Sequence, residues 1–287
     1  MPPEVLLLHT LNGLSFGALL FLVASGFTLV FGLMRIVNLA HGSFYLLGGY
    51  VGVVVMAQTD SFVLALAAGA LAAALAGLVS ERLLLRGVRG KELPEVLLTV
   101  GIAFVVADLS LAVFGGNPKS LDPPDVLSGS VRFGDITYPL YRLTVIAVAI
   151  LVGVGLYLVQ YRSRLGAILR AGVDDRETAA AMGINVDLVF AVMFVIGAAL
   201  AGLAGVVASG LLTIRPGADT DILLFALVVV IVGGLGSVSG AAIGSIFIGV
   251  IDSLARVWFP ELSYFAVFAP MALVLMLRPQ GLLGRTA

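Results

Sequence analysis

Three uncharged polar side chains lie close together between two long apolar runs of this chain. Asn38, His41 and Ser43 fall within the segment "GLMRIVNLAHGSFYLLGG", residues 32–49. An amide, an imidazole and a hydroxyl can exchange hydrogen bonds with a small amphiphilic solute without holding it by a full charge. Weak contacts suit a passage, because a tight site would trap what must leave. We therefore expect Asn38, His41, Gly42 and Ser43 to line a translocation path.

A simpler interpretation of this segment also fits the sequence. Residues 35–41 can form a tight turn between two helices, in which Arg35 only helps to fix the orientation of the chain. The two interpretations differ for His41→Ala, which lowers transport only if His41 belongs to the path.

A second flexible segment, "GGLGSVSG" (residues 233–240), interrupts the uncharged stretch of residues 222–251. Backbone that leaves helical geometry at membrane depth is tolerated only where protein or a watery cavity surrounds it. Transporters use paired interruptions of this kind, one in each half of the chain, to build the substrate path. We expect Gly234, Gly236 and Ser237 to belong to the same path.

The residue types argue against enzymatic chemistry. His9 and His41 are the two histidines and stand in no HExxH pattern, and no GxGD motif occurs. Ser237 and Ser239 have no base beside them in the sequence that would activate a serine. Because the chain has no cysteine, disulfides and thiolate metal sites are excluded. We expect no catalytic residue, no metal ligand and no bound cofactor in this chain.

The elements that position these residues are membrane helices. The chain is 60% hydrophobic and 11% charged, with a mean hydropathy of +1.14, whereas soluble domains are about 25% charged. One helical crossing takes roughly 20 apolar residues. Apolar runs cover residues 11–33, 39–57, 61–80, 93–114, 143–159, 188–212, 222–251 and 262–277. The fold class is therefore an all-α polytopic membrane protein, a bundle of eight or nine transmembrane helices with broken helices.

The basic residues predict the orientation of the bundle. If residues 222–251 cross twice, there are nine crossings and the termini lie on opposite sides. An outside N-terminus and a cytoplasmic C-terminus then place 11 of the 16 basic residues on the cytoplasmic side, as the positive-inside rule demands. A single crossing, or a turn back, would move Arg278 and Arg285 outside.

The longest basic connection, residues 161–185, is larger than a connector needs to be. Asp174 and Glu177 have the spacing of a capping box, an alanine run favours helix, and Gly183 provides a left-handed stop. We expect a two-turn helix outside the membrane beside a second short helix at residues 164–171. Helices this short are marginal in water, which suggests that a partner packs on them. A solvated positive-inside loop is the alternative.

Four motifs, in order, make the chain similar to LivH-type permease subunits of branched-chain amino-acid ABC importers. They are "NLAHG", the EAA-like coupling loop with "RAGVDDRETAAAMGIN", "GGLGSVSGAAIG" and "PQGLLGR". The resemblance covers nearly the whole chain and implies one transmembrane permease domain over residues 1–287, type II-like, with a coupling loop at residues 161–185. Carried over residue by residue, it assigns the ATPase contact to Arg170, Ala171, Asp175, Glu177, Ala180 and Gly183.

The resemblance also implies partners and a location. A second permease subunit, two cytoplasmic ABC ATPases that hold ATP and Mg, and an extracytoplasmic solute-binding protein would assemble with this chain in a prokaryotic inner membrane. No nucleic acid is expected. The solute would be a branched-chain or related amino acid, with urea or a short amide as the alternative. A stand-alone secondary transporter is the other alternative. Whether the second permease is a homologue or another copy stays open.

Two carboxylates need an explanation, Asp108 inside an apolar run and Asp252 directly after one, because a charge inside a span costs about 2.5–3.5 kcal/mol on insertion scales. Asp252 precedes Arg256 by four residues, the spacing of a helical ion pair. Asp108 lies about two turns from the outer end of its helix and is near enough to hydrate. It departs from the family, where an amide is commoner, and leaves the solute in doubt. The loop of residues 115–139, rich in Pro, Gly and Asp, fits a docking surface or mobile lid.

Overall fold

A computed structural model describes residues 3–34, 37–134, 136–174, 176–278 and 280–284 of the chain. Within these residues, eight helices are long and apolar enough to cross a membrane, two of them together with a short adjoining turn. They are α1 (Pro3–Met34), α2 (His41–Thr59), α3 (Phe62–Val79), α4 (Glu92–Phe114), α5 (Leu140–Arg162), α8 (Val186–Ser209), α10 (Val238–Trp258) and α11 (Ser263–Leu277). The prediction of an all-α bundle is confirmed.

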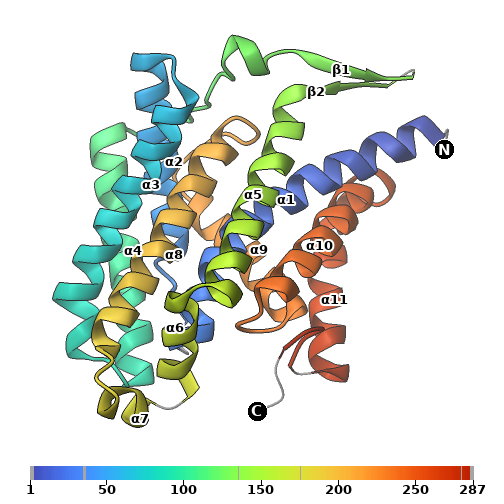
Figure 1. Cartoon of the computed structure of the whole chain (residues 1–287). Coiled ribbons are helices and arrows are strands. Elements are labelled where there is room, and N and C mark those ends of the chain that lie inside the picture. Colours follow the sequence, from blue (N-terminus) through green and yellow to red (C-terminus); the bar gives the residue numbers. More distant parts are fainter. Residues whose placement is uncertain (1–2, 35–36, 135, 175, 279, 285–287) are drawn as a thin grey trace.

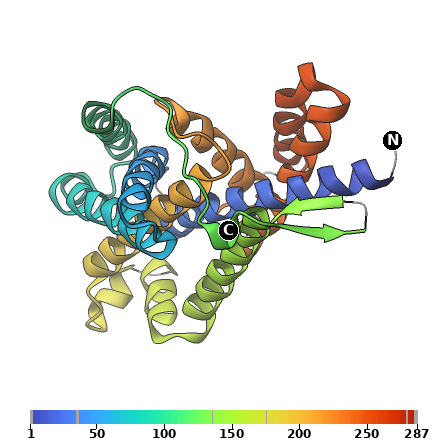
Figure 2. The ribbon, with the colours of Figure 1, turned by 90° about the horizontal axis from the view of Figure 1, so that it is seen from above.

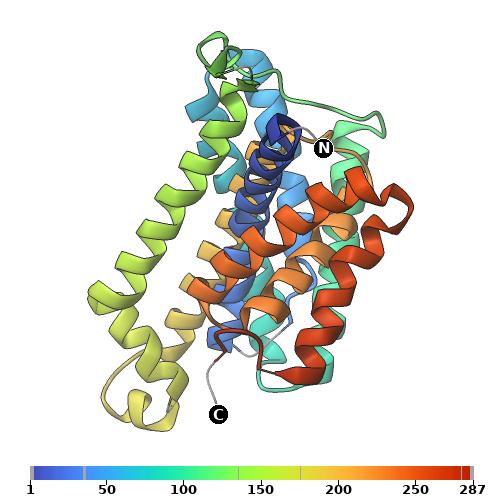
Figure 3. The same ribbon diagram turned by 90° about the vertical axis from the view of Figure 1, so that its right-hand side faces the viewer.

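The uncharged stretch of residues 222–251 forms parts of two helices joined by the Gly-rich turn. Helix α9 (Ala218–Gly233) runs to the Gly-rich turn, and α10 returns from it. With 16 residues, α9 is about 24 Å long, shorter than a hydrocarbon layer of roughly 30 Å. The two termini lie at opposite ends of the bundle (Figures 1 and 3). Whether α9 makes a full crossing, which would give nine, stays a prediction.

The centre of the bundle is held by helices whose backbones almost touch. α10 runs antiparallel to α1, and a Cβ atom placed on Gly13 would lie 2.7 Å from the Cα of Val250. α8 crosses both α2 and α3, where a Cβ on Gly202 would lie 2.5 Å from the Gly69 carbonyl oxygen. Small residues allow this approach, which supplies dispersion contact that lipid cannot provide as a driving force.

The remaining long helices cover the outside. In the view from above, α11 stands at one side of the bundle and α5 lies along another (Figure 2). Few of their side chains are buried, and several large apolar ones are exposed, among them Leu151 on α5 and Leu273 and Met276 on α11. Aliphatic side chains on such faces fit a lipid environment.

The end of the bundle that carries the N-terminus is closed by a small antiparallel sheet. Strands β1 (Ser130–Phe133) and β2 (Ile136–Pro139) form a hairpin beside the first turns of α1 (Figure 1). The buried Tyr138 ties this hairpin to α1, because its hydroxyl donates to the Leu11 carbonyl at 2.8 Å and lies 2.7 Å from Ser15 Oγ. Lys119 pairs with Ile214 by backbone bonds. The loop of residues 115–139 is therefore fastened at several points.

Candidate functional site

At the first predicted interruption the chain is not helical, and the helix that follows, α2, begins inside the bundle. α2 has 19 residues, whereas α3 with its following turns spans 26. A difference of seven residues corresponds to about 10 Å. The entry of α2 packs against the middle of α1, since His41 Nε2 lies 2.9 Å from the carbonyl oxygen of Val23. Non-helical chain at residues 37–40 thus replaces the first turns of α2.

The polar residues of this entry are bonded to the chain itself. Asn38 Oδ1 accepts from the Ala40 N–H at 3.1 Å, and Ser43 Oγ donates to the Ala40 carbonyl at 2.8 Å. Thr99 on α4 supports the same segment by accepting from the Leu39 N–H at 3.2 Å. Buried backbone groups outside a helix need such partners. These residues therefore stabilise the interruption, and all except the half-buried Leu39 are buried.

His41 is fully buried and has a defined hydrogen-bonding state. Its Nε2 can bond to the Val23 carbonyl only as a donor, which leaves Nδ1 as the acceptor in the neutral ring. Within the described residues Nδ1 has no hydrogen-bond partner. The ring also meets Phe27 edge to face, with centroids 5.6 Å apart. Gly42 follows where α2 meets α9, and a Cβ there would lie 3.2 Å from the Cβ of Leu223.

The second predicted interruption is closed by the end of the chain. Gly234 and Gly236 have φ values of 111° and 78°, which favour glycine. Ser237 caps α10, its Oγ accepting from the Gly240 N–H at 3.0 Å. The N–H groups of Leu282 and Leu283 donate to the last carbonyls of α9, at Val232 and Gly233, both at 2.9 Å. The Gly-rich motif and the C-terminal motif are therefore parts of one structure.

The two interruptions do not lie side by side. Gly42 meets α9 near its first residues, at Asp219 and Leu223, whereas Gly234 follows the last residue of α9. The 15 residues from Asp219 to Gly234 correspond to about 22 Å of helix. Asn38, His41, Gly42 and Ser43 form one cluster, and Gly234, Gly236 and Ser237 form another. Their placement in a translocation path stays a prediction.

The predicted helices between the fifth and sixth long helices are both present. α6 (Arg164–Asp174) and α7 (Arg176–Ala181) lie at the end of the bundle opposite the N-terminus (Figure 1). α7 ends in a Schellman motif, in which Ile184 N–H donates to Ala179 at 3.1 Å and Gly183 N–H to Ala180 at 3.0 Å. Gly183 has the expected left-handed φ of 84°.

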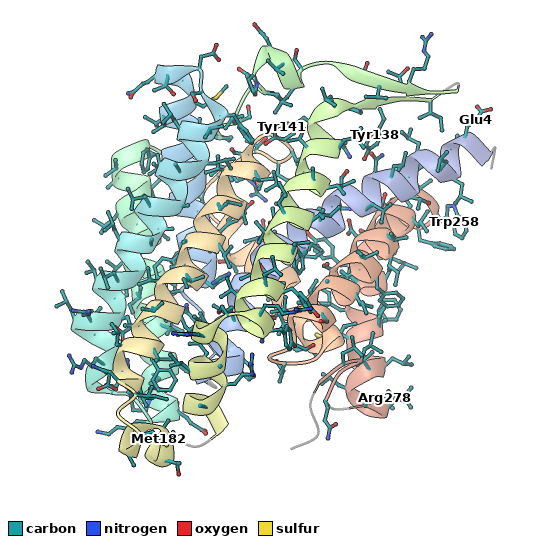
Figure 4. All side chains as sticks on the ribbon, in the orientation of Figure 1. Glu4, Tyr138, Tyr141, Met182, Trp258 and Arg278 are labelled. Atoms are coloured by element: carbon teal, nitrogen blue, oxygen red, sulfur yellow. The ribbon has the colours of Figure 1, made fainter. Side chains whose placement is uncertain are left out.

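Ala179 packs α7 against the bundle. Ala179 is buried against Val186 and Phe190, while Ala180 and Met182 are exposed, and Met182 marks the tip of the structure in Figure 4. Of the other predicted ATPase contacts, Ala171 is exposed on α6 and Glu177 lies in α7. Asp175 lies outside the described residues.

Arg170, another predicted contact, is directed toward the membrane helices. It donates to the carbonyl of Gln160 and lies over the ring of Tyr161, 5.9 Å from its centroid. Its contacts thus fix α6 to the end of α5, and the side chain is half-buried. The assignment of Arg170 to an ATPase contact stays a prediction.

The two carboxylates in the spans have different surroundings. Asp252 Oδ2 accepts from Arg256 Nε at 2.7 Å, which confirms the predicted ion pair. Asp108 is exposed on α4. A charged group missed by the sequence reasoning lies near the other end of α4, where Arg89 bonds to both Glu81 and Asp187. In the sequence, Arg89 stands out only as one of several basic residues at positions 82–91. That pattern does not indicate that Glu81 and Asp187 are its ion-pair partners.

Comparison with known proteins identifies the family. Residues 9–277 match the model of the branched-chain amino acid transport system permease component. The high-affinity branched-chain amino acid transport system permease protein BraD of Pseudomonas aeruginosa is 31% identical over 99% of this chain and 98% of its own length. LivH of Salmonella typhimurium is 31% identical, covering 96% of this chain and 94% of that protein. A probable LivH of Methanocaldococcus jannaschii is 29% identical over 93% and 89%.

Among solved structures, PsaBC from Streptococcus pneumoniae in complex with Fab is similar to this chain with a TM-score of 0.47 and 13% identity. The similarity covers 93% of this chain and 89% of that chain.

Proposed function

This chain belongs to the permease-component family of branched-chain amino acid transport systems, and on that premise we propose that it is the membrane-spanning subunit of an ATP-driven importer. In this proposal residues 1–287 act as one permease domain that forms the translocation path. The solute is a branched-chain or related amino acid delivered by a solute-binding protein. ATP hydrolysis takes place on partner subunits.

The pair α6 and α7 is the observation that carries the proposal. A helix of six residues is too short to be stable alone in water, yet α7 has a defined stop and a defined face toward α8. Ala180 of α7 and the large apolar side chain of Met182, the first residue after α7, are both exposed. Such an exposed surface fits a partner protein, whereas a gradient-driven carrier has no need of a docking helix.

The proposed assembly contains this chain, a second permease subunit, two ABC ATPases and an extracytoplasmic binding protein. The ATPases, which hold ATP and Mg, would contact α6 and α7 around Ala171, Ala180 and Gly183. The binding protein would meet the opposite end, where the hairpin β1–β2 lies and where the exposed Val126 precedes β1 in the turn Asp125–Leu127. The membrane is the prokaryotic inner membrane.

We propose that the end carrying α6 and α7 is cytoplasmic. Arg86, Arg89 and Lys91 lie between α3 and α4 at that end, and Arg162 and Arg164 lie where α5 meets α6. Basic residues concentrated on one side of a membrane protein mark its cytoplasmic side. This orientation leaves the N-terminus outside and the C-terminus in the cytoplasm.

A branched-chain amino acid is the solute that the relatives' names support, since both BraD and LivH carry that description. The same machinery importing urea or a short amide is the alternative, and Asp108 on α4 is the feature of this chain that keeps it open. Competition of labelled leucine uptake by isoleucine, valine, urea and acetamide separates the two. Inhibition by urea or acetamide alone would contradict the amino-acid assignment.

The ATPase contact can be tested by cross-linking, because the chain has no natural cysteine. Ala180→Cys is made in the assembled transporter with its ATPases and treated with a thiol-to-amine cross-linker. The expected product joins this chain to an ATPase. Val126→Cys, also exposed but in the short turn Asp125–Leu127 that precedes β1, is the matched control and should give none. Absence of the product from Ala180→Cys, in a complex that still transports leucine, would overturn the assignment.

A further inference from the structure

Arg89 forms a buried bridge between two parts of the chain that lie far apart in sequence. One guanidinium nitrogen, Nη2, pairs with the carboxylate of Glu81, and the other, Nη1, donates to Asp187 Oδ1 at 2.5 Å. The guanidinium also lies over the ring of Phe190, 5.1 Å from its centroid. The side chains of Arg89 and Glu81 are 9% and 2% exposed. A planar guanidinium can hold two acids at once, which an ammonium group cannot do with the same geometry.

The bridge starts at an irregular end of α3. After Val79 the helix widens into a π-helical turn at Ser80–Leu84, where Glu81 is buried and Leu83 points outward, 75% exposed. Short π-helical segments often occur at functional sites. A buried ion pair gives little net stability, and apolar side chains of equal volume would often serve as well. A reason other than stability is therefore needed for the cluster.

The bridge ends next to α7. Asp187 lies in the first turn of α8, which is capped by Asn185, whose Oδ1 accepts from the Leu188 N–H at 3.0 Å. The Schellman motif of α7 precedes this cap directly, and Ala179 of α7 packs on Val186 and Phe190 of α8. The two caps and the apolar contact therefore restrict movement of α7 relative to Asp187.

We propose that Arg89 is a positioning residue that couples the movement of α7 to α3. This inference rests on the function proposed above. A displacement of α7 carries the first turn of α8 with it, and the guanidinium holds Glu81, and with it the end of α3, to Asp187. α3 packs on α2 and α8, so the displacement reaches the helix whose entry is held by Asn38 and His41.

Arg86 provides a matched control on the same loop. Its Nη2 lies 3.9 Å from Asp187 Oδ2, but its side chain is 62% exposed. An exposed pair at this distance contributes little because water and salt screen it. Arg86→Gln and Arg89→Gln remove the same charge from the same connection, and only the second removes the link between Asp187 and Glu81.

The experiment measures leucine transported per ATP hydrolysed, in proteoliposomes that contain the complete transporter and its binding protein. For Arg89→Gln we expect ATPase subunits to remain bound and active while this ratio falls about tenfold, a usual size for coupling between two sites. Arg86→Gln should keep the wild-type ratio. A role of Arg89 in folding alone would lower the amount of assembled complex and leave the ratio unchanged.

A second variant decides the question if Arg89→Gln does not fold. Asp187→Asn keeps the shape of a side chain that is 45% exposed, and it should also lower the ratio with the complex intact. A wild-type ratio in Asp187→Asn, or in a folded Arg89→Gln, overturns the coupling role of Arg89. Absence of ATP-driven leucine transport in the wild type would instead overturn the proposed function.

Discussion

Glycines in the inner and outer helices of this bundle have opposite surroundings. On α8, a Cβ atom at Gly202 would lie 2.5 Å from both the Ala73 Cβ and the Gly69 carbonyl oxygen. On α5, a Cβ at Gly155 would meet no atom of the described chain within 4 Å. The residue type is the same, but only the first position depends on the absence of a side chain.

This difference in glycine packing distinguishes the central helices, which hold the interruptions, from the outer helices, which cover them. α1, α2, α8 and α10 are in backbone contact, and the helix interruptions lie among them. α4, α5 and α11 expose aliphatic and aromatic faces that lipid or another chain can cover. A tightly packed centre can hold non-helical backbone in place, whereas an outer helix needs only the right length and an apolar surface.

The largest expected effect tests the packed centre directly. Gly202→Leu forces a side chain into the backbone of α3, which should cost about 3 kcal/mol or more and abolish the folded protein. Gly155→Leu, the same change on α5, should leave stability unaltered. Thermal unfolding in detergent and gel filtration measure both. Equal stability of the two variants would show that the inner contact is not needed.

An intermediate effect is expected at the entry of α2. His41→Ala removes the donor to the Val23 carbonyl and leaves a cavity between α1 and α2, at an expected cost of about 2 kcal/mol. Leucine uptake should fall while the ATPase subunits still bind, because α6 and α7 lie at a distance. Uptake at the wild-type rate, measured on equal amounts of membrane protein, would remove His41 from the path.

The smallest expected effect concerns the hairpin that closes the N-terminal end. Tyr138→Phe deletes the hydroxyl that bonds to Leu11 and Ser15, which should lower the free energy of unfolding by about 1 kcal/mol. Tyr264→Phe, at a residue 70% exposed on α11, should not change it. Chemical or thermal unfolding compares the pair, and an equal loss in both would mean that the Tyr138 hydroxyl does not hold the hairpin.

Much of the fold could be predicted because its signals are local. Long apolar runs mark the spans, and positions such as Gly69, Ala73 and Gly77, four apart, mark a face of α3 that does pack on α8. The stop at Gly183 and the ion pair of Asp252 with Arg256 also depend on neighbours within one or two turns. Such features follow from helical geometry alone.

What could not be predicted depends on distant partners. Arg89 and Asp187 are 98 residues apart in sequence, and a loop arginine near a span is equally typical of the positive-inside rule. The separation of the two interruptions by α9 required the packing of α2 on α9. The roles of Asn38 and Ser43 in bonding Ala40 likewise depend on how deeply the entry of α2 is buried.

The bonds from Leu282 and Leu283 to the end of α9 have a consequence for biosynthesis. Because Leu282 and Leu283 follow α10 and α11 in the sequence, a ribosome makes them after both helices, and the carbonyls of Val232 and Gly233 gain these partners only then. A nascent polypeptide that stops before residue 282 contains α9, α10 and α11 but lacks the two N–H groups that bond to the Val232 and Gly233 carbonyls. The Gly-rich turn after α9 therefore gains these two bonds only after α10 and α11 have been synthesised.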